Sequence, residues 1–220
     1  MPGQYYINPE AYSLVKFQCS LESRELIPSR QLLRQNLKQN FDILHTSGIK
    51  TIAVLLSRLK SKSKISEFAE QTGISVDYLT LLRREAKSYF PAPVKLARFI
   101  GVDQTLISKL EDRGINSSKK LYELAANQDH FTVFLEESGI CISDLSVLIS
   151  LSDLSRLYGV GPTFAAVLFE AGIDSTQTLM KYTGEQIRSR YEERTQRKAD
   201  FTSRDIDFTL EIAKELESIR

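Results

Sequence analysis

The stretch Leu44-His-Thr-Ser-Gly-Ile-Lys-Thr-Ile-Ala-Val-Leu55 contains the pattern that decides the fold: leucine, three residues, Gly-Ile, one residue, Ser or Thr, three residues, leucine. The same pattern returns at 110–121 and at 168–179. Its glycine suits the left-handed position that ends a helix, where a β-carbon is penalised. The following isoleucine and the preceding leucine then make the contact of a Schellman ending, and the Ser or Thr caps the next helix. Each copy therefore predicts a helix, a tight turn and a second helix.

Further glycines recur at fixed distances from these turns. Gly-Ile occurs again at Gly73 and Gly139, 25 residues after the first two copies, and Gly-Val occurs at Gly101 and Gly159, 13 residues before the last two. No alternating strand pattern competes with the helical spacing. The sequence thus predicts an all-α protein, a tandem array of three related helical units. Read as a plain scaffold, every glycine is a cap and every leucine is core, so function must come from the turns and the surface.

The predicted organisation has an arm and three units. We expect an N-terminal arm with one short helix at 1–27, a basic helical unit at 28–90, a second unit at 94–152 and a third unit at 153–220. The linker Phe90-Pro-Ala-Pro93 separates the first unit from the second.

Two segments carry a family resemblance. Leu154-Ser-Arg-Leu-Tyr-Gly-Val-Gly-Pro-Thr-Phe-Ala-Ala-Val-Leu168 resembles a helix-hairpin-helix motif, in which two helices flank a Gly-hydrophobic-Gly turn. Leu96-Ala-Arg-Phe-Ile-Gly-Val-Asp-Gln-Thr-Leu-Ile-Ser-Lys-Leu110 is a less faithful copy. The hairpins fall at 101–105 and 159–163, and the order of units resembles a bacterial family of unknown activity with tandem domains of this kind.

The resemblance implies that the protein binds the backbone of a nucleic acid, such as DNA, without reading its sequence. Backbone N–H groups of such a turn, beside the positive end of the next helix, hold a phosphate oxygen without reading a base. The groups carried over by position are Gly159, Val160, Gly161 and Thr163. The pattern is imperfect, because Pro162 has no N–H and Asp103 replaces the second glycine of the other hairpin, where a helix-capping role explains it better. The alternative is that both hairpins are structural turns.

Charge is distributed unevenly along a chain whose net charge is only +1. Residues 1–90 carry 13 Lys or Arg against 8 Asp or Glu, whereas residues 91–220 carry 16 against 20. Residues 43–66 contain no carboxylate, and if 59–64 is a loop between packed helices it gathers the cations into one patch that binds phosphates. The alternative is a solvated basic loop. The predicted nucleic-acid-binding cations are Lys50, Arg58, Lys60, Lys62, Lys64, Arg83, Arg84 and Lys87.

Composition narrows the remaining classes. The chain lacks an apolar run long enough for a bilayer, and its start lacks a signal pattern, so we expect a cytoplasmic protein without membrane contact. Cys19 and Cys141 lack metal spacing, and we expect buried free thiols. His45 and His130 form no metal-spaced pair, and no nucleophile or phosphate-loop motif is present. The sequence therefore predicts no enzyme activity, no cofactor and no metal.

Two functions lead, and an enzyme that uses a carboxylate pair is the third alternative, although no pattern singles out one pair among the 28 acidic residues. The first is a non-catalytic protein that contacts nucleic-acid backbone through the basic unit and the 159–163 turn. The second is a protein-interaction scaffold or homo-oligomer in which the hairpins only pack.

Overall fold

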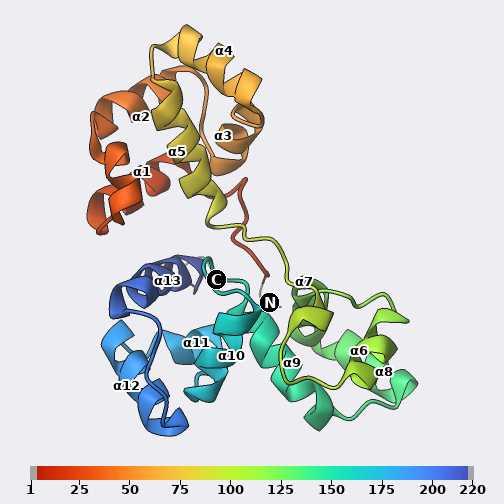
Figure 1. The fold of residues 1–220 in the computed structure, drawn as a ribbon. Helices are drawn as coiled ribbons and strands as arrows, with labels where there is room; N and C mark the ends of the chain where they lie inside the picture. Colours follow the sequence, from red (N-terminus) through yellow and green to blue (C-terminus); the bar gives the residue numbers. More distant parts are fainter. Residues whose placement is uncertain (1–3, 218–220) are drawn as a thin grey trace. The chain divides into compact units, whose positions relative to one another are not determined.

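The computed structural model describes residues 4–217, and within that range the chain forms helices and loops but no β-strand. Two isolated antiparallel bridges, Ser13 with Thr51 and Lys95 with Ser117, are the nearest approach to a sheet. The all-α prediction is confirmed. The chain divides into two compact units, and Figure 1 shows the helices of each.

The N-terminal unit comprises residues 7–90. Its elements are α1 (Leu14–Ser23), the 3₁₀ helix η1 (Pro28–Arg34), α2 (Leu37–Thr46), α3 (Ile52–Arg58), α4 (Lys62–Thr72) and α5 (Val76–Lys87). Helix α5 contacts η1, α3 and α4, so its apolar face is the centre of this unit. The predicted arm is thus divided, since residues 7–27 with α1 belong to this unit and residues 4–6 do not.

The C-terminal unit comprises the described residues 4–6 and 91–217. Its elements are the 3₁₀ helix η2 (Leu96–Arg98), α6 (Gln104–Glu111), α7 (Ser118–Ala126), α8 (Gln128–Ser138), α9 (Ile142–Leu154), α10 (Pro162–Glu170), α11 (Thr176–Leu179), α12 (Gly184–Thr195) and α13 (Ser203–Glu217). Helix α9 contacts both α7 and α10 and runs through position 152, where the sequence suggested a boundary between two units. One compact body therefore contains both predicted hairpin segments.

The three Gly-Ile turns share one local geometry. Gly48, Gly114 and Gly172 have φ of +83°, +77° and +79°. In each turn the isoleucine N–H donates to the carbonyl of the leucine five residues earlier, at 3.1, 2.9 and 2.9 Å, which is the long bond of a Schellman ending. These leucines and isoleucines are buried. Each glycine therefore ends a helix as predicted. The predicted side-chain cap of the next helix forms at Thr51 and Ser175, but the side chain of Ser117 makes no capping hydrogen bond, so that part of the prediction is wrong for the second copy.

A second backbone contact fixes where the helix after each turn begins. In the first two copies, the N–H groups of Ile52 and Ser118 donate to the carbonyls of Tyr12 and Val94, at 3.0 and 2.8 Å. In the third copy the N–H of Thr176 donates instead to the carboxylate of Asp153, at 2.6 Å. A side chain has replaced a carbonyl at the same structural position.

Asp153 belongs to a polar cluster that holds the first described residues of the chain. It accepts from Arg156 Nε at 2.7 Å, and Arg156 also donates to the carbonyl of Gln4 at 3.3 Å. The hydroxyl groups of Tyr5 and Ser118 lie 2.7 Å apart. Tyr5 and Arg156 are both almost fully buried, so Tyr5 is part of the core of the C-terminal unit, whereas Gln4 is exposed and is held through its backbone carbonyl.

The N-terminal unit buries a carboxylate between two guanidinium groups. Glu85 on α5 is fully buried and pairs with Arg24 and with Arg30, whose Nε lies 2.8 Å from the carboxylate. Removing one partner from such a cluster leaves charge in a medium that solvates it poorly. The cluster therefore ties α5 to α1 and η1.

The cysteine prediction is wrong, because both free thiols are exposed. Cys19 lies on the outer face of α1, and Cys141 precedes α9 at a turn whose buried position is taken by Ile140. No helix within the described residues is long and apolar enough to cross a membrane.

Candidate nucleic-acid interface

The cations predicted from residues 43–66 lie on and beside α3 and α4. Lys50, Arg58, Lys60, Lys62 and Lys64 are all exposed. The loop is shorter than the predicted 59–64, because α3 ends at Arg58 and α4 begins at Lys62. Ser61 caps α4 by accepting the N–H of Lys64 at 3.2 Å, so two lysines fall in the first turn of that helix.

That placement costs stability, since a cation beside the positive end of a helix is disfavoured by about 0.3–1 kcal/mol. An anion bound at the same helix end would interact favourably with both the lysines and the free backbone N–H groups. The start of α4 is therefore a place where negative charge is favoured.

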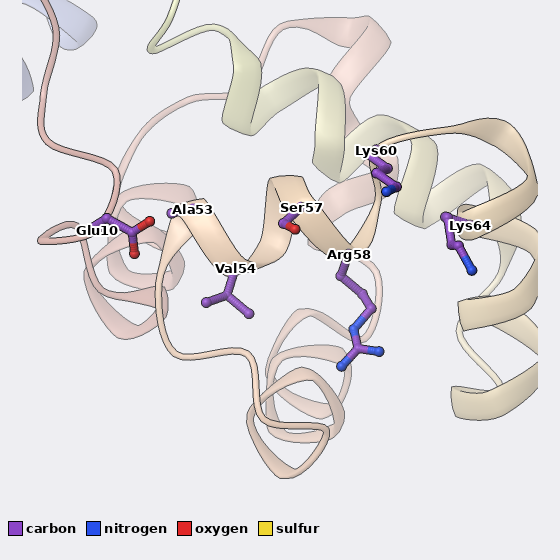
Figure 2. A pocket seen from close by; sticks show the side chains of 7 residues that line it. All are labelled: Glu10, Ala53, Val54, Ser57, Arg58, Lys60 and Lys64. Atoms are coloured by element: carbon purple, nitrogen blue, oxygen red, sulfur yellow. The ribbon is translucent and has the colours of Figure 1, made fainter.

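Three of these cations line a surface hollow of about 460 Å³ (Figure 2). Ala53, Val54 and Ser57 on α3 form its wall, and Arg58, Lys60 and Lys64 are its cations. Glu10 is the carboxylate among the lining residues. The hollow thus has an apolar wall with positive charge at one end.

Two contacts with neighbouring helices position the loop and the cations that line the hollow. Arg83 on α5 donates from Nη2 to the carbonyl of Lys60 at 2.8 Å, which anchors the loop between α3 and α4. The Arg58 guanidinium lies over the ring of Phe68, 5.8 Å from its centroid. The half-buried side chain of Arg83 therefore positions the loop through its hydrogen bond to the backbone of Lys60 and does not line the hollow itself.

The cations of the hollow differ in their partners. Lys64 pairs with Glu67 at 2.6 Å, and the hydrogen bond from Lys64 lowers the pKa of Glu67. Such an exposed pair is weakly held and screened by salt. Within the described part of the chain, neither Arg58 nor Lys60 forms an ion pair with a carboxylate. These two charges are available to a ligand.

The other predicted cations are exposed but do not line the hollow; they are Lys50, Lys62, Arg84 and Lys87. Sequence reasoning missed Glu10 and the apolar wall. Glu10 follows Pro9, whose carbonyl accepts the N–H of Ala53 at 3.1 Å, and no local pattern announces that contact.

The hairpin at 159–163 is a left-handed turn that leads into α10. Gly159 has φ +85° and is exposed, whereas Val160 is buried and its N–H donates to the carbonyl of Leu157 at 3.1 Å. Gly161 is the N-cap residue of α10, with φ of −78°, and Thr163 is exposed in the first turn. Of the four groups carried over from the helix-hairpin-helix pattern, Val160 is thus already used internally.

The hairpin at 101–105 has a different role for its aspartate. Asp103 caps α6, and its carboxylate accepts the N–H of Thr105 at 2.9 Å, as the capping interpretation predicts. A hollow of about 270 Å³ beside it is lined by Asp103 and Asp144 as well as by Lys109. Two carboxylates at that hollow disfavour a phosphate group.

Within residues 4–217, no group of three His, Cys, Asp or Glu side chains could hold a metal ion. The model of a family described as a domain of unknown function (DUF4332) matches residues 101–211, just over half of the chain. No curated protein and no solved structure matches the chain. The matched range contains the two hairpins and lies outside the N-terminal unit.

Proposed function

This chain belongs to the DUF4332 family, and we propose that it is a non-catalytic protein that binds nucleic-acid backbone without reading sequence. The observation that carries the proposal is the hollow on α3, where Arg58 and Lys60 lie together with no carboxylate paired to either within the described residues. A phosphodiester backbone supplies negative charges at regular spacing to such a group of cations.

The chemistry favours phosphate over a base edge. Arg58 offers a planar set of N–H donors that fits phosphate oxygens, while Lys60 and Lys64 act as point charges. Lys64 can exchange its ion pair with Glu67 for a phosphate group, because an exposed ion pair contributes little free energy. With about two or three phosphates neutralised, affinity falls about 10- to 40-fold between 50 and 200 mM salt.

The turn at 159–163 is the second part of the proposal. Gly161 has no side chain, and the N–H groups of the first turn of α10 have no partner within the helix. These groups suit a single phosphate oxygen, which adds affinity without sequence preference. The cations Lys50, Lys62, Arg84 and Lys87 contribute through their field rather than through the hollow.

The test is an anisotropy titration with labelled mixed-sequence single-stranded DNA, duplex DNA and RNA at several salt concentrations. Arg58→Ala with Lys60→Ala is compared with Lys38→Ala with Lys95→Ala, which removes the same charge from exposed residues elsewhere. We expect the first variant to lose about tenfold in affinity and to lower the salt slope by about two. Absence of binding at low salt, or equal losses in the two variants, would refute the proposal.

Protein interaction is a second candidate, favoured by helix α8. None of its described residues is buried, although it carries Phe131, Val133, Phe134 and Leu135. A helix with so many apolar side chains normally buries a face. Light scattering together with a pull-down tests for an occupant of that face.

A further inference from the structure

The surface around α8 is acidic. Residues 121–155 contain six Asp or Glu and no Lys or Arg; Glu123 and Asp153 pair with Lys119 and Arg156 just outside this stretch, and the other four carboxylates form no ion pair within the described residues. In residues 43–66, by contrast, there are five Lys or Arg and no Asp or Glu. The acidic stretch lies in the C-terminal unit and the basic stretch lies in the N-terminal unit.

Val133 is an exposed apolar residue of α8. Its side chain is 50% exposed. Asp129, Glu136 and Glu137 lie four residues before it and three and four residues after it, and therefore share its face of α8. All three carboxylates are exposed and form no ion pair within the described residues. Val133 is thus an exposed apolar side chain with one carboxylate before it and two after it on the same face of α8.

The hollow on α3 has the complementary shape and charge. Its wall includes the apolar side chains of Ala53 and Val54, and Val54 is 36% exposed. Arg58, Lys60 and Lys64 lie at one end (Figure 2). A volume of about 460 Å³ is larger than one valine side chain, which leaves room for neighbouring carboxylates to reach the cations.

We propose that the chain associates with itself head to tail, with the Val133 face of α8 on one copy seated in the α3 hollow of a second copy. The valine contacts Ala53 and Val54, and Glu136 and Glu137 pair with Arg58 and Lys60. The charge complementarity selects a second copy as the occupant, because both matching surfaces belong to this chain. Long-range attraction brings the surfaces together, and added salt weakens the association.

The contact joins two different surfaces, so it is heterologous. In a pair of copies joined once, one hollow and one α8 face remain unoccupied. Further copies then add, and the average mass rises with protein concentration. Nucleic acid that occupies the same cations competes with this assembly, but the assembly itself does not require nucleic-acid binding.

Charge reversal on each surface tests the contact by sedimentation velocity at low salt over a wide concentration range. We expect Lys60→Glu with Lys64→Glu to remain monomeric, and likewise Glu136→Lys with Glu137→Lys. Mixed in equal amounts, the two variants should assemble, because each supplies the charge that the other lacks. The matched control, Glu111→Lys with Asp112→Lys, reverses two adjacent exposed carboxylates outside the α8 face and should assemble like the wild type.

The outcomes separate this proposal from the nucleic-acid proposal. Glu136→Lys with Glu137→Lys should lose self-association and retain DNA binding, whereas Lys60→Glu with Lys64→Glu should lose both. Glu10 lies at the hollow and should repel the incoming carboxylates, so Glu10→Gln should strengthen assembly several-fold. A wild-type protein that stays monomeric at every concentration, or a mixture that fails to assemble although both variants keep the wild-type circular dichroism, overturns the proposal.

Discussion

Replacement by alanine should destabilise the protein at Gly159 but not at Gly161, although both glycines belong to the 159–163 turn. Gly159 has φ +85°, and an added Cβ would lie 3.6 Å from Thr209 Oγ1, an ordinary contact. The cost of Gly159→Ala is therefore conformational, about 1–2 kcal/mol. Gly161 has φ −78° and nothing within 4 Å of an added Cβ. Its alanine variant gains about 0.4–1 kcal/mol from a less flexible unfolded chain and loses a similar amount as a poorer N-cap, so it should remain near wild-type stability.

Urea unfolding followed by circular dichroism measures both variants, since the chain contains no tryptophan. With a slope of about 2 kcal/mol/M, the midpoint for the C-terminal unit should fall by about 0.5–1 M in Gly159→Ala and stay nearly constant in Gly161→Ala. DNA binding is measured on the same samples. Weaker binding by a stable Gly161→Ala protein indicates contact between the turn and the backbone. Equal destabilisation of the two variants would refute the assignment of the left-handed position to Gly159 alone.

Three further predictions concern stability. In Gly184→Ala the new Cβ would lie 2.4 Å from the backbone oxygen of Ser203, so α12 and α13 must separate; we expect a loss of at least about 2–3 kcal/mol, and a variant that melts like the wild type would contradict this packing. Glu85→Ala removes the buried carboxylate that pairs with both Arg24 and Arg30 and should cost about 3–5 kcal/mol in thermal unfolding of the N-terminal unit, whereas exposed Glu67→Ala should cost little. Burial raises the pKa of Tyr78 to about 12 from 10, so its contribution of up to about 2–3 kcal/mol is complete below pH 10 and is lost as pH rises toward 12. Denaturant midpoints across this pH range should fall in the wild type and less in Tyr78→Phe; identical slopes would show that another group titrates.

Helix ends were predictable from the sequence because they depend on local chemistry. Only glycine adopts a left-handed φ without penalty, so Gly48, Gly114 and Gly172 announce their turns. The capping role of Asp103 is visible for the same reason, since a carboxylate and the N–H that it accepts lie two residues apart. The cations of the hollow were predictable as a group because they are close in sequence.

Contacts between distant residues were not predictable in this way. Glu10 reaches the hollow through a bond between Pro9 and Ala53, and no spacing rule connects those positions. Tyr5 packs with Ser118 across more than a hundred residues. Residue spacing along the chain predicted the helices and the group of cations. The residues that pack around those cations come from distant parts of the chain, and no spacing pattern in a single sequence reveals such contacts.

Because residues 4–6 and 91–217 form one body, the segment 7–90 is inserted within it. During synthesis the whole inserted segment is made before Ser118 and Ser155, which form hydrogen bonds with the Tyr5 hydroxyl group in the folded protein. The short segment before the insertion is therefore made earlier than residues 7–90 but reaches its native contacts later. Until α9 has been synthesised, the side chain of Tyr5, which is 1% exposed in the folded protein, lacks its native contacts and is exposed to water or to a chaperone.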